Sequence, residues 1–358
     1  MPETEPQPSA TPRRRDVALD ALRMIAVLLM MASHTTRLIS WDERRGWSRF
    51  SLLIEPLTAS LFLILVGTSL AHSWQSFRNR PGGRALWYRK QMVRAAMLWI
   101  LSCVFYSLEE GFHLPDAVTM SGILATIAYT ILAGMLLVSA SRPIPILLAV
   151  CAALLGLEAW LDARGLKVFV LNGGNSPLLP LFLFACLGAL GALALESGNR
   201  PARAGLVTVA LLTLAILLGR HPFADIFSKP LGRYETARIV ARMNDNVRVE
   251  KSIPYYNLRP ILVPMIASLV VLAYAILALL RRPLERTARW LLPMGRHSLD
   301  VYILHLSLLA MLVLKGGMRP LGKAWQGDAA IGALIVICYA WTVGRERFWR
   351  RAGRSAAA

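Results

Sequence analysis

Residues 17–38 have the sequence VALDALRMIAVLLMMASHTTRL, an apolar stretch that contains an acid, an arginine and a histidine. Its length is that of a helix crossing the hydrocarbon core of a bilayer. An arginine within such a stretch is costly in lipid, so it should face the protein interior or a wet cavity and meet a partner there. The segment therefore predicts a transmembrane helix with one polar, inward-facing side.

The polar residues of this segment fall on one face of the predicted helix. Arg23 and His34 are separated by three turns and a small rotation, so they lie about 16 Å apart along a common face. Asp20 precedes Arg23 by three residues, within pairing reach on that face. The stripe is either an anchored, hydrogen-bonded helix surface or a catalytic one, because histidine readily accepts a proton near neutral pH.

Composition extends the membrane assignment to the whole chain. Of its 358 residues, 56% are hydrophobic and only 17% are charged, outside the range of ordinary soluble domains. Only helices satisfy their backbone groups in lipid at this composition, so we predict an all-α, polytopic transmembrane bundle. The ten predicted spans are residues 17–38, 51–72, 91–108, 117–139, 145–162, 176–196, 203–219, 258–280, 298–315 and 328–344.

The distribution of Lys and Arg predicts that both termini are cytoplasmic. Residues 1–16 are expected to form a disordered cytoplasmic tail rather than a signal peptide, and residues 345–358 a basic cytoplasmic tail. Between them, residues 17–344 form the transmembrane domain. Its one long external segment, 220–259, is either an ordered loop packed on the bundle rim or a lid that also offers a platform for a sugar acceptor.

Two other classes of protein are disfavoured. The net charge of +19 lies mostly at the ends of apolar segments, where Lys and Arg orient spans, so no nucleic-acid partner is expected. The four cysteines lie in apolar segments without paired spacing, so neither a disulfide framework nor a metal site is expected.

A second informative stretch is 294–309, MGRHSLDVYILHLSLL. Ser298, Tyr302 and His305 are spaced i, i+4 and i+7, which places them on one face of the ninth span. Ser298 is a plausible N-cap, and a helix N-terminus beside Arg296 offers donors and positive charge to a phosphate. The alternative is that these polar residues serve as interhelical hydrogen-bonding groups.

Together the two stretches resemble the acyltransferase-3 superfamily of membrane proteins. Arg23, ten residues and His34 match its R-x10-H signature, and residues 294–305 are similar to its late motif, GRHSL-x-x-Y-x-x-H. Three middle segments resemble helices of the branch related to heparan-alpha-glucosaminide N-acetyltransferase: residues 58–71, 121–133 and 176–191.

The resemblance implies a cytoplasmic acyl-CoA donor, an acyl group delivered across the bilayer and a carbohydrate acceptor beyond it. His34 carries over as the catalytic histidine and Arg23 as the buried arginine of the motif, with Tyr302 and His305 as late-motif residues. In the heparan-type branch an asparagine stands at the position of His34 and a histidine follows further on, where this chain has none near Arg45. A heparan-like acceptor is therefore not expected.

Arg and Lys side chains are the usual ligands for the phosphates of a donor such as acyl-CoA. Each such residue in this chain is also consistent with simple anchoring of a span at the membrane boundary. The candidate donor-binding residues are Arg84, Arg89, Lys90, Arg94 and Arg296. Asp20 and the intramembrane acid Glu55 are expected to orient groups or balance charge; the alternative for Glu55 is to anchor a boundary turn before Pro56.

The leading hypothesis is an acyl-CoA-dependent O- or N-acyltransferase of the bacterial inner membrane that acylates, most simply acetylates, a cell-envelope glycan or glycolipid. His34 would deprotonate the acceptor, or form a transient acyl-histidine. The alternative is a proton-coupled transporter or flippase using Asp20, Arg23, Glu55 and His34, which the lack of an internal repeat disfavours. A scaffold that has lost activity is the third possibility.

Overall fold

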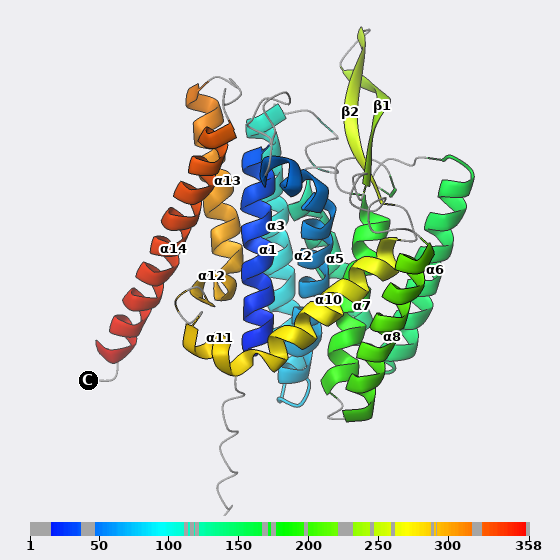
Figure 1. Ribbon diagram of the computed structural model, residues 1–358, viewed down its shortest axis with the longest axis vertical. Helices are drawn as coiled ribbons and strands as arrows, with labels where there is room; N and C mark the ends of the chain where they lie inside the picture. The colour runs from blue at the N-terminus through cyan, green and yellow to red at the C-terminus, as the bar shows by residue number, and fades with distance from the viewer. Residues whose placement is uncertain are drawn as a thin grey trace, which may run out of the picture.

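The computed structural model describes residues 16–36, 47–110, 114, 118, 122–166, 171–172, 177–196, 200–220, 232–243, 247–258, 262–287, 290, 292–316 and 324–355. These residues form a bundle of helices with one β-hairpin at its end (Figure 1). The long helices are α1 Val17–Thr36, α2 Trp47–Phe77, α3 Gly83–Glu110, α5 Ile123–Val138, α6 Pro143–Ala163, α7 Leu178–Glu196, α8 Arg200–Arg220, α10 Leu262–Leu279, α13 Ser298–Gly316 and α14 Ala324–Ser355. Two short helices, α11 Arg281–Thr287 and α12 Leu292–Arg296, connect α10 to α13.

Each predicted span coincides with one of the long helices, so the helical bundle is confirmed. Among the described residues, five helices are long and apolar enough to cross a membrane, namely α1, α2, α3, α6 and α14, and five more are shorter and apolar. Many large apolar side chains on the outer helices are exposed, as expected of a surface that lipid covers. The protein is therefore an integral membrane protein.

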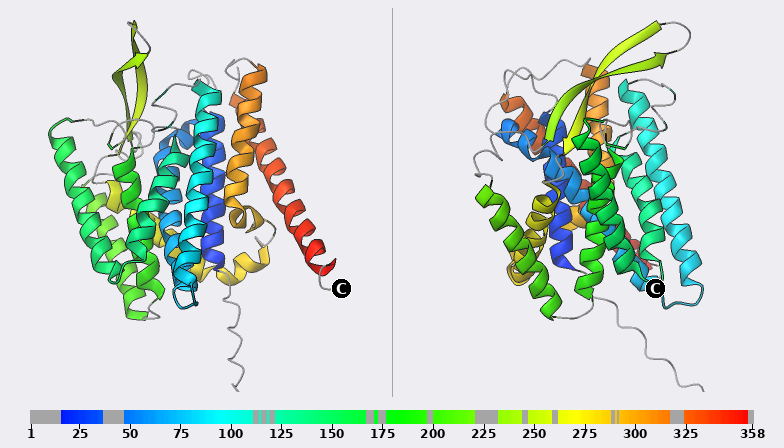
Figure 2. Two further views of the ribbon diagram at one scale, coloured as in Figure 1. Left: turned by 180° about the vertical axis from the view of Figure 1, so that it is seen from behind. Right: turned by 90° about the vertical axis from the view of Figure 1, so that its right-hand side faces the viewer.

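Helix α1 is the centre of the half of the bundle that carries both sequence motifs. It contacts α2, α10, α12, α13 and α14, and 67% of its apolar stretch is buried, against 22% for α3. In Figure 1, α1 runs between α13 on one side and α2 and α3 on the other, while α14 lies at the edge. Figure 2 shows α14 at the edge as well. Polar residues on α1 are therefore held inside the protein, as the cost of charge in lipid requires.

Helices α2 and α7 cross at a very short distance. A Cβ on Gly67 would overlap the backbone carbonyl of Ala185, and one on Gly188 would overlap that of Ile64. Small residues at such crossings let two backbones approach closely, which supplies packing energy where lipid gives no hydrophobic driving force. This crossing fixes the helix that forms one wall of the site described below.

The two ends of the bundle differ in character. The N-terminal ends of α1, α3 and α13 lie at one end with the C-terminal end of α14, and the C-terminal end of α1 lies at the other (Figure 1). Asp16 marks the first end: its Oδ1 accepts from the amide of Ala18 at 2.9 Å, an N-cap, and its Oδ2 accepts from Tyr274 at 2.8 Å. Asp16 thus belongs to the bundle and not to a disordered tail; residues 1–15 lie outside the described part.

The basic segment at the C-terminus is helical rather than a separate tail. Helix α14 continues through the predicted span and ends at Ser355. The segment has no proline, and Glu346 precedes Arg350 by four residues, a spacing that supports an exposed helix.

The external segment, expected as a loop, contains two antiparallel strands, β1 Gly232–Met243 and β2 Val247–Leu258. Gly232 pairs with Leu258 and Met243 with Val247. The hairpin stands at the end of the bundle where α1 ends (Figure 1, Figure 2). Charged residues alternate with uncharged ones over residues 233–236 and 247–250, a period-two pattern typical of strands, so the sequence carries a partial signal for the hairpin.

Candidate active site

The two motif segments meet through their histidines. Nδ1 of His34, on α1, lies 3.0 Å from Nε2 of His305, on α13. Nδ1 of His305 lies 3.0 Å from the backbone carbonyl of Val301, and the His305 side chain is completely buried. Sequence analysis placed each histidine on an inward face, and the structure joins them in one hydrogen bond.

Tyr302 connects the histidine pair to the rest of the core. Its ring meets that of His305 edge-on, with centroids 5.4 Å apart and planes at 87°, and meets Phe62 of α2 at 6.1 Å. Only 4% of Tyr302 is exposed. The i, i+4, i+7 spacing therefore predicted correctly that Ser298, Tyr302 and His305 face the interior, since Ser298 lies on the same side.

A cavity of about 50 Å³ adjoins Tyr302. Its polar lining comes from five residues, Arg23, Ser69, Arg94, Ser298 and Tyr302, and its apolar lining comes from α2, α3, α5 and α13. Its volume suffices for a few water molecules or one small polar group. Because Tyr302 both lines the cavity and contacts His305, it lies between the cavity and the histidine pair.

Asp20 and Ser69 help to hold Arg23 in this cavity. Its Nη1 donates to Oδ1 of Asp20 at 3.0 Å, as the three-residue spacing predicted, and its Nη2 donates to Oγ of Ser69 at 2.8 Å. Ser69 lies on α2 and had no signal of its own in the sequence. The guanidinium is thus fixed against α1 and α2, with 23% of its side chain exposed.

The basic residues predicted for donor phosphates divide into two groups. Arg84, Arg89 and Lys90 are exposed on α3, whereas Arg94 turns inward and lines the cavity. The inward face of α3 is marked by buried Trp87, Gln91 and Leu98, a helical spacing that also includes Arg94.

Arg94 has an unusual charge environment. Its guanidinium is close enough to Arg23 to be repelled by it. Among the described residues, no carboxylate lies within ion-pair distance of Arg94. Two cations therefore line one small cavity, and Asp20, which pairs with Arg23, also pairs with another arginine.

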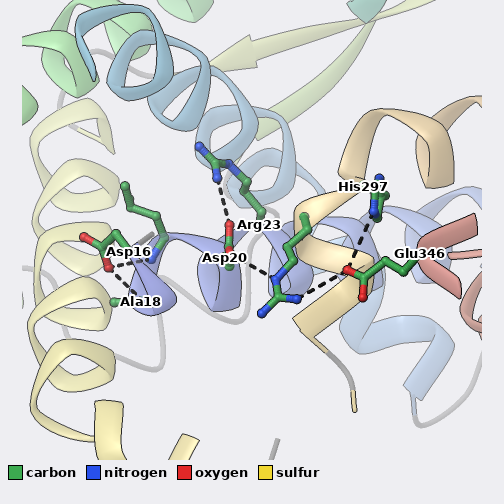
Figure 3. A network of polar contacts seen from close by, with 8 residues as sticks. Asp16, Ala18, Asp20, Arg23, His297 and Glu346 are labelled. Carbon is green, nitrogen blue, oxygen red and sulfur yellow. Dashed lines mark hydrogen bonds and ion pairs between the residues drawn. The ribbon is translucent and has the colours of Figure 1, made fainter. Parts of the chain in front are cut away.

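That other arginine is Arg296, which was predicted as a donor-binding residue and which forms ion pairs within the protein. Its Nε lies 3.6 Å from Oδ2 of Asp20 and its Nη1 lies 3.3 Å from Oε1 of Glu346. Figure 3 shows the two carboxylates, Asp20 and Glu346, within one network of polar contacts. Arg296 is thus already engaged by two carboxylates. Ser298 is the first residue of α13 rather than its N-cap, because the helix starts there, and its side chain lines the cavity instead.

Further ion pairs attach α14 to this end of the site. Nε2 of His297 lies 3.8 Å from Glu346 and its Nδ1 lies 3.3 Å from Asp300, which also pairs with Arg345. The acid and base on α14 fall in the segment taken as a tail, so sequence analysis missed them. Glu55 lies on α2, but its side chain is outside the described part.

The comparisons with known proteins give one family match. The family described as "Acyltransferase domain", acyltransferase-3, matches residues 16–344, which include both motif segments and every site residue named above except Arg345 and Glu346. No curated protein matches the chain. A match over nearly the whole length shows that the chain belongs to the acyltransferase-3 family.

Proposed function

We propose that the protein moves an acyl group, acetyl in the simplest case, from cytoplasmic acyl-CoA to a hydroxyl or amino group of a cell-envelope glycan or glycolipid. One observation carries the proposal: Tyr302 lies between a cavity lined by Arg94 and Arg23 and the hydrogen-bonded pair of His305 and His34, so these side chains form one line through the core. A buried polar line of this kind is expensive in a membrane protein, so it is expected to serve function.

The donor enters from the end of the bundle where α1 and α3 begin. We take this end as cytoplasmic, with ten spans and both termini inside, in the membrane of a bacterial cell. The pyrophosphate binds Arg94 and Arg23, because Arg94 has a charge that no described carboxylate balances. Exposed Arg84, Arg89 and Lys90 meet the outer phosphate. The extended pantetheine arm then covers much of the roughly 16 Å along α1 to His34.

His34 supplies the chemistry at the far end of the arm. It takes the proton from the acceptor hydroxyl or amine, whose oxygen or nitrogen forms a bond to the thioester carbonyl carbon. The carbon–sulfur bond breaks, and the CoA thiolate leaves and takes the proton from His34, which returns the imidazole to its neutral form. Holding donor and acceptor at one point supplies much of the rate, since it removes the entropy of their encounter.

Within the family we place the chain nearest the branch related to heparan-alpha-glucosaminide N-acetyltransferase, on the strength of three middle segments, 58–71, 121–133 and 176–191. The histidine at position 34 separates it from that branch. The acceptor is therefore an envelope carbohydrate rather than a heparan-like one.

The test uses purified full-length protein in lipid nanodiscs with acetyl-CoA, and measures release of free thiol. We expect slow release, and a loss of about 10²–10⁴-fold in His34→Ala, the usual contribution of a general base. His72→Ala, in α2 and outside the site, is the matched control and should keep the wild-type rate. Thiol release that survives His34→Ala contradicts the proposal, as does substrate uptake into vesicles without thioester cleavage, which indicates a transporter.

A further inference from the structure

We propose that His305 is a positioning residue that fixes the tautomer of His34, keeping the proton on Nδ1 and the lone pair on Nε2. In this arrangement Nε2 of His34 is the atom that takes the acceptor's proton. The assignment of the proton rests on contacts alone, while its role in turnover rests on the function proposed above.

The contact between the rings has the geometry of an in-plane hydrogen bond. The ring centroids are 5.2 Å apart and the planes differ by 16°. This separation is close to the 3.0 Å between Nδ1 of His34 and Nε2 of His305 plus one ring radius at each end. The two nitrogens therefore point at each other along the line of centres, as a directional hydrogen bond requires. Rings stacked face to face would have closer centroids.

The position of each proton follows from the one partner that cannot donate. The backbone carbonyl of Val301 only accepts, so Nδ1 of His305 must donate to it. In a neutral ring Nε2 of His305 is then an acceptor, and it faces Nδ1 of His34, which must be the donor. A neutral His34 that donates from Nδ1 holds its lone pair on Nε2.

Burial and helix geometry keep His305 in this state. The ring is completely buried, so charging it costs far more than keeping it neutral. Val301 precedes His305 by four residues, and the helix itself therefore sets the carbonyl beside the ring. Orientation of a functional imidazole by a hydrogen bond to its other nitrogen is a common arrangement at metal and catalytic sites.

The same bond also favours the charged intermediate. When Nε2 of His34 takes up a proton, the ring becomes a cation and its Nδ1–H bond to His305 becomes charge-assisted, hence stronger. A neutral acceptor in this position stabilises the cation without placing a carboxylate in the dry core. Loss of His305 should therefore lower the rate of turnover more than the affinity for the donor.

The first test observes the proton directly and needs no activity. Protein labelled with ¹⁵N only in its six histidines is studied by NMR in nanodiscs, and His34→Gln identifies the His34 signals. We expect the Nδ1–H tautomer in the wild type and in His305→Gln, whose amide oxygen can replace Nε2 as acceptor. His305→Leu, which has no acceptor, should lose it. A wild-type His34 that carries its proton on Nε2 overturns the proposal.

The second test measures thiol release from acetyl-CoA. We expect kcat to fall about 10–100-fold in His305→Leu, as for other residues that orient a functional group, with KM unchanged and partial recovery in His305→Gln. A wild-type kcat in His305→Leu overturns the proposal. If His305→Leu does not fold, the wild-type spectrum and His305→Gln still decide. The Nδ1–H tautomer in a wild type without thioester activity would refute the proposed function and leave the proton assignment standing.

Discussion

Gly295 of α12 lies directly against the backbone carbonyl of Asp20 in α1, and a Cβ on it would overlap that oxygen. The contact explains why a glycine precedes Arg296 in the second motif. It brings α12 close enough for the Arg296 guanidinium to reach the Asp20 carboxylate, which also holds Arg23. Gly295 of the second motif thus helps to position Asp20, which pairs with Arg23 of the first motif.

Substituting Gly295 by Ala should destabilise the protein, because the neighbour that has to move is helix backbone rather than a flexible side chain. Overpacking of this kind costs about 1–3 kcal/mol or more. The measurement is the thermal midpoint of detergent-purified protein, with Gly191→Ala in α7 as the control. Gly191 has no atoms near the Cβ position, so alanine there should leave the midpoint unchanged or raise it. Equal midpoints for the two variants would contradict the argument.

The fold was largely accessible from the sequence because lipid imposes a simple rule on it. Each apolar block had to become a helix, and the ten predicted blocks correspond to the ten long helices. Helical periodicity within one segment also placed Arg23, Tyr302 and His305 on inward faces. These predictions depend only on residues close in the chain.

Relations between helices were not accessible in this way. The bond between His34 and His305, the Ser69 contact to Arg23 and the engagement of Arg296 by Glu346 all depend on how helices are rotated against one another. Helical periodicity shows which side of a helix faces inward, but it does not show which other helix packs against that side. The spacing of apolar residues in α3 already indicated that Arg94 faces inward. The prediction nevertheless treated Arg94 together with Arg84, Arg89 and Lys90 as one basic cluster, because it considered only their charge.

Asp20→Asn should lower stability and disturb the cavity together. Asp20 is 2% exposed and pairs with both Arg23 and Arg296, so its neutral form removes an ion pair from Arg23 and leaves Arg296 with Glu346. We expect a loss of about 1–3 kcal/mol in unfolding free energy, typical of a buried partner left unsatisfied.

A control for Asp20→Asn is Glu285→Gln, which breaks the exposed i, i+4 pair with Arg281. Exposed pairs contribute little, so this loss should be about 0.5 kcal/mol or less. The two variants are compared by thermal unfolding in the same detergent and salt. A loss in Asp20→Asn as small as that of the control would show that Asp20 is not the structural link between the two arginines.

Arg94→Gln should weaken donor binding with little change in kcat. A hydrogen bond to a charged group contributes about 1.5–3 kcal/mol. At about 1.4 kcal/mol per factor of ten, KM for acetyl-CoA should rise about 10–100-fold. Arg89→Gln on the exposed face of the same helix removes the same charge and should raise KM only slightly, in a way that added salt suppresses. Equal effects of the two variants would mean that the buried cavity does not hold the pyrophosphate.

Replacing the hairpin, residues 232–258, by a short Gly-Ser linker should leave cleavage of acetyl-CoA intact and lower transfer of the acyl group to the acceptor. Gly232 and Leu258 are paired across the two strands, so their backbones lie within about 5.5 Å and a short linker joins them without strain on α10. The hairpin stands at the end of the bundle where α1 ends, so its loss should leave acetyl-CoA binding intact. If it is a lid or acceptor platform, thiol release continues as hydrolysis while transfer to a soluble envelope sugar falls several-fold. The measurement is the ratio of acylated sugar to total thiol, and a ratio equal to that of the wild type would reduce the hairpin to an ordered external segment without a part in transfer.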